Sequence, residues 1–205
     1  MSTYSLCDLA CARTTVRRRL ELTPRKAMGG FTLIELMVTI GIAAILAGVA
    51  APSLREVIAN NRLKSHSSAL QTSLMLARSE AINRKARVVV CKSADQAACA
   101  SAGNWQQGWI VFIDANDSAS VDAGETVIQK VGTLSGSFIL QAGGNVTDYV
   151  SYTSTGAAKL KASDSFQTGS FNLCQTAGGN ARQIELFATG RLSFGKQSVS
   201  TCTAS

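Results

Sequence analysis

One apolar segment constrains this chain more than any other feature of its sequence. Residues Phe31–Ala51 form a run of 21 residues that contains a single charged side chain, Glu35. A helix of this length reaches about 30 Å, which is enough to cross the hydrocarbon core of a bilayer. A secretory signal peptide is the competing interpretation, but it carries its small residues after the apolar region, whereas Gly29 and Gly30 precede this one. We therefore expect a membrane-anchoring helix.

The net charge is unevenly distributed along the chain. The sequence has 20 Lys and Arg residues against 13 Asp and Glu, a formal net charge of +7. Residues 1–30 hold six basic and two acidic residues, which is more than half of the excess. Basic residues beside an apolar segment keep that flank in the cytoplasm, so this charge sets membrane topology. The other 175 residues carry only +3, and binding to nucleic acid would need a local basic patch.

The rest of the chain predicts one folded domain of the α+β class. With 46% hydrophobic and 16% charged residues, the chain can bury enough apolar surface to fold. Apolar residues recur at helical spacing to about Asn83, which predicts a single helix over residues 32–83. Shorter β-forming runs then predict an antiparallel sheet packed on the second half of this helix. The expected strands are Arg87–Cys91, Gly108–Asp114, Glu125–Val131, Phe138–Gln141, Tyr149–Thr153, Ser170–Cys174, Arg182–Phe187 and Arg191–Phe194, with glycine-rich loops at 143–145 and 178–180.

The six cysteines divide on either side of the apolar segment. Two lie before it, and four lie beyond it: Cys91, Cys99, Cys174 and Cys202. An even set of four on the far side of a membrane suits two disulfides in an oxidising compartment. Of the three connectivities we expect Cys91–Cys99 and Cys174–Cys202. With one histidine and no Cys-x-x-Cys, no metal site is expected, and nothing calls for a cofactor.

The start of the apolar segment carries a recognisable motif. Gly30-Phe31-Thr32-Leu33-Ile34-Glu35-Leu36 resembles the N-terminal signature of type IV prepilins and type II secretion pseudopilins. The resemblance implies that prepilin peptidase removes residues 1–30 as a leader, cutting after Gly30 on the cytoplasmic side. It also implies that the new N-terminal residue, Phe31, is N-methylated.

Glu35 is expected to act in assembly. An ionised carboxylate inside a membrane costs at least about 2.5 kcal/mol, so an intramembrane acid is a functional candidate by default. Cleavage creates a cationic amine on Phe31, four residues earlier, and an ion pair with such an amine would offset that cost. The resemblance implies pairing with a neighbouring subunit. The alternative is a glutamate shallow enough to reach the lipid headgroups.

Segments of the second half of the chain narrow the resemblance to the FimT/GspH branch, which comprises minor pilins and the minor pseudopilin H. They are Leu76–Ala81, Val90–Cys99, Trp105–Phe112 and Gly190-Arg191. The resemblance implies a long N-terminal helix packed on an antiparallel β-sheet, and a single-pass inner-membrane protein whose C-terminal domain lies in the periplasm before it enters a pilus or pseudopilus. Its partners would be prepilin peptidase, other pilins or pseudopilins in a helical fibre, and the inner-membrane assembly platform. The expected divisions are a leader over 1–30, a transmembrane half-helix over 31–51, a periplasmic amphipathic half-helix over 52–86 and a β-rich domain over 87–205.

DNA is the alternative partner. Some members of this branch take up DNA through a basic Gly-Arg-x-Arg motif near the C-terminus, but Gly190-Arg191-Leu192-Ser193 lacks the second arginine. Arg182 and Lys196, with Lys159 and Lys161, would have to complete a patch around Arg191. The competing interpretation, which we favour, is a sheet edge whose charges only discourage aggregation.

Two further chemistries have weaker support. The segment Asp114–Glu125 places oxygen donors at several positions of a 12-residue calcium loop, but Ala119 stands where that loop needs glycine, and a polar hairpin connection explains the same residues. Enzymatic activity is not expected, because no Gly-x-Ser-x-Gly or His-Glu-x-x-His motif occurs. Trp105 and Trp109 are expected to be buried anchors of the core and not a stacking platform.

Overall fold

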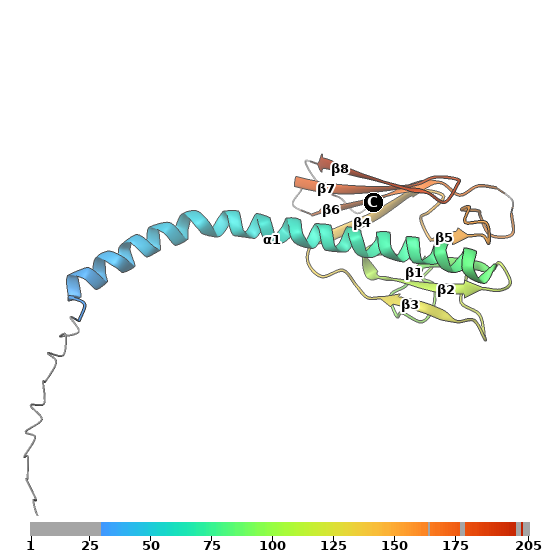
Figure 1. Cartoon of the computed structure of the whole chain (residues 1–205), viewed down its shortest axis with the longest axis horizontal. Helices are drawn as coiled ribbons and strands as arrows, with labels where there is room; N and C mark the ends of the chain where they lie inside the picture. Colours follow the sequence, from blue (N-terminus) through green and yellow to red (C-terminus); the bar gives the residue numbers. More distant parts are fainter. Residues whose placement is uncertain (1–29, 164, 177–178, 200–201, 203–205) are drawn as a thin grey trace, which may run out of the picture. The chain divides into compact units, whose positions relative to one another are not determined.

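The computed structural model describes residues 30–163, 165–176, 179–199 and 202, without the side chains of residues 49–53 and 199. Apart from Gly30, the expected leader lies outside these residues. The chain separates into two compact units, Met1–Leu46 and Ala47–Ser205. One helix, α1 (Leu33–Arg84), begins in the first unit and ends in the second (Figure 1).

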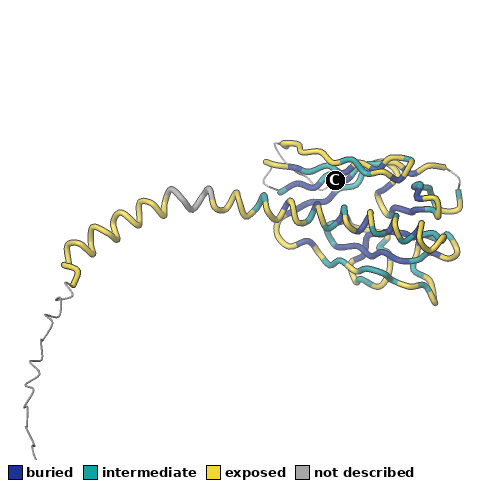
Figure 2. Tube along the Cα trace, viewed as in Figure 1, coloured by how far each residue is buried: buried dark blue, intermediate teal, exposed yellow. Residues whose placement is uncertain are grey.

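In the first unit, the start of α1 is capped by its own sequence. The hydroxyl of Thr32 accepts a hydrogen bond from the N–H of Glu35 (3.2 Å), and the Thr32 carbonyl accepts one from Leu36 (3.1 Å). Threonine followed three residues later by glutamate is the sequence pattern of a capping box. Residues 30–46 are all exposed, including large apolar side chains such as Phe31 at 82% and Ile45 at 71% (Figure 2).

The described residues contain no helix that combines the length and the apolarity needed to cross a membrane. The expected span Phe31–Ala51 includes residues 49–51, whose side chains lie outside the described part of the chain.

In the second unit, eight strands form two four-stranded antiparallel sheets (Figure 1). The first has the order β3-β2-β1-β5 and the second the order β4-β6-β7-β8. A single turn of 3-10 helix, η1 (Trp105–Gln107), precedes β2. The strands are β1 Arg87–Lys92, β2 Trp109–Asp114, β3 Val127–Val131, β4 Phe138–Gly144, β5 Tyr149–Tyr152, β6 Gly169–Gln175, β7 Gly179–Leu186 and β8 Leu192–Val199.

The second half of α1 packs against both sheets. Its buried apolar residues follow helical spacing and are Leu63, Leu70, Leu74, Ala77 and Ala81. They share one hydrophobic core with residues of both sheets, including Val111 of β2 and Ile184 of β7. The expected α+β fold, with a long helix on antiparallel strands, is therefore confirmed. The strands form two sheets where we expected one, because the buried stripe of the helix is covered from two sides.

The two tryptophans are buried in this core, as expected. Trp109 is fully buried, and its indole N–H donates to the hydroxyl of Ser73 on α1 (2.9 Å). Trp105 donates to the carbonyl of Thr147 (2.9 Å), and its ring meets that of Phe171 edge to face at 5.0 Å. Their polar N–H groups are satisfied while their rings fill the interior.

The loops expected at 143–145 and 178–180 were wrong for Gly143, Gly144 and Gly179, whereas Gly178 lies outside the described residues. Gly143 and Gly144 are the last residues of β4, where they pair with Ser170 and Gly169 of β6. The two backbones approach so closely that a Cβ on Gly169 would overlap the Gly143 carbonyl oxygen. Glycine is used here for close strand approach and not for a turn. Gly179 likewise begins β7.

We predict that Leu74→Ala lowers the free energy of unfolding by about 2–5 kcal/mol, because it leaves a cavity where α1 meets both sheets. Met75→Ala is the matched control: this neighbouring side chain is 55% exposed, and its loss should change stability by less than about 0.5 kcal/mol. Urea unfolding of the detergent-solubilised chain, followed by the fluorescence of the buried tryptophans, measures both. Equal effects of the two variants would contradict this account of the core.

Candidate functional site

The processing motif lies at the exposed start of α1. Glu35 is the third residue of the helix, and a Cβ placed on Gly30 would meet nothing within 4 Å, so space alone does not require glycine there. Among the described residues, no hydrogen bond or ion pair is made by the Glu35 carboxylate, whereas its backbone N–H donates to the Thr32 hydroxyl. The acidic group is therefore free to meet a group from outside the chain.

The cations of the expected basic patch fall into separate places. Arg182 of β7 and Lys196 of β8 are directly paired across the sheet. With Asn60 of α1 they line a cavity of about 230 Å³. Arg191 precedes β8 at its other end, where its guanidinium lies 5.3 Å from the centroid of the Phe187 ring. The structure thus brings Arg182 and Lys196 together but leaves Arg191 apart, since five residues of strand span about 17 Å.

The other two lysines are engaged elsewhere. The ammonium of Lys161 donates to the carbonyl of Ser118 (3.3 Å), in the loop that follows β2. The ammonium of Lys159 lies 5.8 Å from the centroid of the Phe166 ring. Both belong to the segment after β5, so they do not extend the Arg182–Lys196 pair.

A junction around Arg78 was not foreseen from the sequence. The Arg78 guanidinium, on α1, donates to the carbonyls of Gly156 and Thr189, each at 3.0 Å. Gly190 has φ +75°, and a Cβ there would overlap the Gly156 carbonyl oxygen. Arginine and two glycines therefore join α1 to two turns from opposite sheets. The segments Leu76–Ala81 and Gly190-Arg191, which carried the resemblance, were the available signal for this junction.

Tyr152 lies close to the same junction. Its side chain is fully buried, and among the described residues its hydroxyl has no hydrogen-bond partner. Burial raises the pKa of Tyr152 well above its usual value, while the positive charge of Arg78 acts in the opposite direction. The tyrosine therefore remains neutral at physiological pH.

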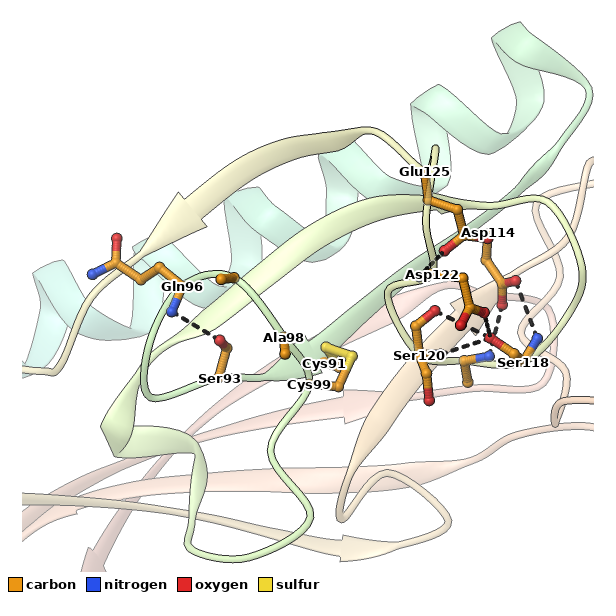
Figure 3. The surroundings of a disulfide bond; sticks show 12 residues. Cys91, Ser93, Gln96, Ala98, Cys99, Asp114, Ser118, Ser120, Asp122 and Glu125 are labelled. Carbon is orange, nitrogen blue, oxygen red and sulfur yellow. Dashed lines mark hydrogen bonds between the residues drawn. A yellow bond between two sulfur atoms is a disulfide. The ribbon is translucent and has the colours of Figure 1, made fainter.

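Carboxylates of the acidic loop after β2 accept hydrogen bonds from backbone N–H groups of the same loop (Figure 3). The buried carboxylate of Asp114 accepts the N–H groups of Ser118 (3.1 Å) and Ala119 (2.9 Å). Glu125 accepts the N–H of Asp122 (3.0 Å). Hydrogen bonds from Asn116 and then Ser118 lower the pKa of Asp122. The loop is therefore a hairpin connection stabilised by its own internal hydrogen bonds.

This loop also covers the outer face of the first sheet. Ala119 is only 6% exposed and packs in a second hydrophobic cluster with Val89, Cys91 and Phe112. A calcium loop would need glycine at position 119. Here the methyl group of Ala119 fills space in this cluster. Within the part of the chain that the structure describes, no group of three or more His, Cys, Asp or Glu residues is arranged to hold a metal ion.

Both expected disulfides are present. Cys91 of β1 is joined to Cys99 beside the acidic loop (Figure 3), and Cys174 of β6 is joined to Cys202. The turn inside the first disulfide is held by Asp95, whose carboxylate accepts the N–H groups of Ala97 (2.9 Å) and Ala98 (3.0 Å). These hydrogen bonds lower the pKa of Asp95, and the bond from Ala98 has the largest effect.

Comparisons with known proteins identify the relatives of this architecture. A family model described as type II transport protein GspH matches residues 66–190, which is more than half of the chain. A second, described as the prokaryotic N-terminal methylation motif, matches residues 25–51. No curated protein is similar enough in sequence to count as a match.

One solved structure agrees at the level of the fold. A crystal structure of the type IV minor pilin FimU of Pseudomonas aeruginosa matches with a TM-score of 0.52 and 18% identity, over 70% of this chain and 97% of that chain. A second crystal form of FimU gives a TM-score of 0.48 at 18% identity, over 69% and 100% of the two chains. At this identity the first match shows the pilin fold alone.

We predict that Gly190→Ala lowers the free energy of unfolding by at least about 2 kcal/mol, because the methyl group adds a clash with Gly156 to the cost of a left-handed backbone. Gly124→Ala is the matched control, since Gly124 has φ +90° but open space around its Cβ position. It should cost only about 1 kcal/mol. Urea titration measures both, and equal losses would show that the Gly156–Gly190 contact is unimportant.

Proposed function

Because this chain belongs to the family of the type II transport protein GspH, we propose that it is a minor pilin or pseudopilin subunit of a type IV pilus or a type II secretion pseudopilus. Prepilin peptidase removes residues 1–30 by cutting after Gly30 and then methylates the amine of Phe31. Residues 31–51 hold the subunit in the inner membrane, with the two-sheet domain in the periplasm. The subunit then leaves the membrane on the assembly platform and packs beside other pilins.

The observation that carries this proposal is the exposed apolar start of α1. Every residue from 30 to 46 is exposed in the isolated chain, although most of them are apolar. Burying such side chains is worth about 1.5–3 kcal/mol each, so this half-helix is stable only in an apolar surrounding. A bilayer and a bundle of neighbouring helices both provide one. The match to the methylation motif over residues 25–51 supports this order of events.

Glu35 sets the position of an incoming subunit relative to its neighbours in the fibre. Its carboxylate projects from the first turn of α1, where the N–H of Glu35 is already bonded to Thr32. The methylated amine of a neighbouring Phe31 is a cation that can satisfy this carboxylate where water is excluded. A subunit out of register would leave both charges buried and unpaired, which is strongly unfavourable. The pair therefore selects one position for an incoming subunit.

We predict that Glu35→Ala leaves membrane insertion and leader removal intact but abolishes incorporation into fibres. Mass spectrometry of the membrane-bound chain should find the methylated Phe31 terminus, while sheared fibres should lack the subunit. Glu56→Ala, which removes an exposed acid farther along α1, is the control and should incorporate normally. Normal incorporation of the Glu35 variant would refute the assembly role.

DNA binding for natural transformation is the second candidate function. The paired cations Arg182 and Lys196 favour it, because neither forms an ion pair with any described residue. The distance to Arg191 and the low net charge beyond residue 30 weigh against it. We therefore rank a purely structural subunit first.

A retardation assay with duplex DNA tests the second candidate. If the chain binds DNA, the duplex should shift at low salt, the shift should weaken steeply as salt rises, and Arg182→Ala should reduce it. Lys130→Ala, on the exposed part of β3, is the control. Absence of a shift in low salt would remove DNA as a partner.

A further inference from the structure

The four edge strands of the two sheets are covered to different degrees. The segment after β5 returns alongside it, since the N–H of Lys159 donates to the Ser151 carbonyl (3.1 Å). On β4, the N–H of Leu140 donates to the side-chain oxygen of Gln106 (3.2 Å). β3 has only five residues. β8 has eight, contains no proline, and within the described residues pairs only with β7. Its outer N–H and C=O groups form a template for another strand.

Two cavities open along β8, on the side that faces α1. Leu192, Phe194 and Lys196 share this face, because alternate residues of a strand point the same way. Leu192 and Phe194 line a largely apolar cavity of about 190 Å³ together with Met75 of α1. Arg78 and Arg191 also contribute to its lining. Met75 and Phe194 are 55% and 49% exposed. Lys196 lines the second cavity, of about 230 Å³. We call Met75, Leu192, Phe194, Lys196 and Arg182 the β8 groove.

The charge at one end of the β8 groove is unbalanced. Arg182 lies directly opposite Lys196, and like charges in that position destabilise a sheet. Charged side chains on an edge strand discourage aggregation, but Arg182 lies on β7, which is not an edge strand, so edge protection does not explain this second cation. The adjoining cavity holds one acid, Glu56, beside Arg55, and so adds no net charge. A carboxylate from outside the chain would balance the pair.

We propose that the edge of β8 binds an extended segment of another protein, which adds to the second sheet as a further strand. Its apolar side chain packs over Phe194 and Met75, and its carboxylate meets Lys196 and Arg182. The segment runs parallel to β8. Because Phe194 precedes Lys196 by two residues, the segment's two side chains are also two residues apart, in the order apolar-x-acidic. Main-chain hydrogen bonds supply affinity, and the two cavities supply specificity.

The shape of the groove favours a peptide over a nucleic acid. An apolar cavity beside two cations matches alternating apolar and acidic side chains, whereas the phosphates of a duplex would meet only the cations. The N–H and C=O groups that face away from β7, on alternate residues of β8, are unpaired within the described residues, and a peptide backbone offers partners at their spacing whereas DNA does not. This binding does not depend on membership of a fibre, so it goes beyond the proposed function.

The test is fluorescence anisotropy with the detergent-solubilised full chain and a labelled peptide, Thr-Thr-Val-Thr-Leu-Thr-Asp-Thr-Thr. We expect saturable binding that weakens on the order of tenfold, about 1.4 kcal/mol, when the peptide Asp is replaced by Asn. Lys196→Glu should weaken it similarly, whereas Lys130→Glu, the same change on the exposed edge strand β3, should not. A peptide with Lys in place of Asp should bind the Lys196→Glu chain better than the unmodified chain.

Several results would overturn the proposal. The first is that the Asp peptide does not bind. The second is that the Asp and Asn peptides bind the unmodified chain equally well, a comparison that does not depend on the folding of any variant. Binding of duplex DNA, lost in Lys196→Glu, without peptide binding would assign the cation pair to nucleic acid. Self-association lost in Lys196→Glu, again without peptide binding, would assign the edge to a second copy of the chain.

Discussion

The fold depends on one helical stripe being buried from two sides. Leu70 and Leu74 contact a core built by both sheets, and the small residues Ala77 and Ala81 allow the strands to come close to the helix backbone. Each four-stranded sheet would otherwise leave its inner face in water. The outer face of the first sheet needs its own cover, which the acidic loop and the Cys91–Cys99 turn provide. The helix thus organises the domain, and the loops complete it.

A second contact explains why certain polar residues stand where they do. Arg78 satisfies the carbonyls of two turns that arise from different sheets, and Gly190 permits those turns to touch. The two residues of the Gly190-Arg191 pair therefore have different roles. Its glycine belongs to the packing of the domain, while its arginine lies outside, against Phe187. A motif that resembles a nucleic-acid contact in the sequence is partly a requirement of the fold.

Local patterns were enough to predict the elements but not their pairing. The helix was expected over 32–83 and is observed over Leu33–Arg84, because the apolar run of its first half leads directly into the helical periodicity of its second half. All eight strands overlap the expected runs, since β-branched residues and turns delimit them. The division into two sheets was missed because it depends on contacts between distant strands. The same applies to Arg182 and Lys196, which are adjacent only through the register of the β7–β8 hairpin. Gly143 and Gly144 were misread because close backbone approach leaves no local signature.

The Cys174–Cys202 disulfide has a mechanical consequence. Its two cysteines are 28 residues apart, and both β7 and β8 lie between them. The hairpin is therefore closed into a covalent ring that begins on β6. Tension applied to the chain beyond Cys202 would pass through the disulfide to β6, so the hydrogen bonds between β7 and β8 would not have to carry it. The edge of the second sheet is built to bear load without unravelling.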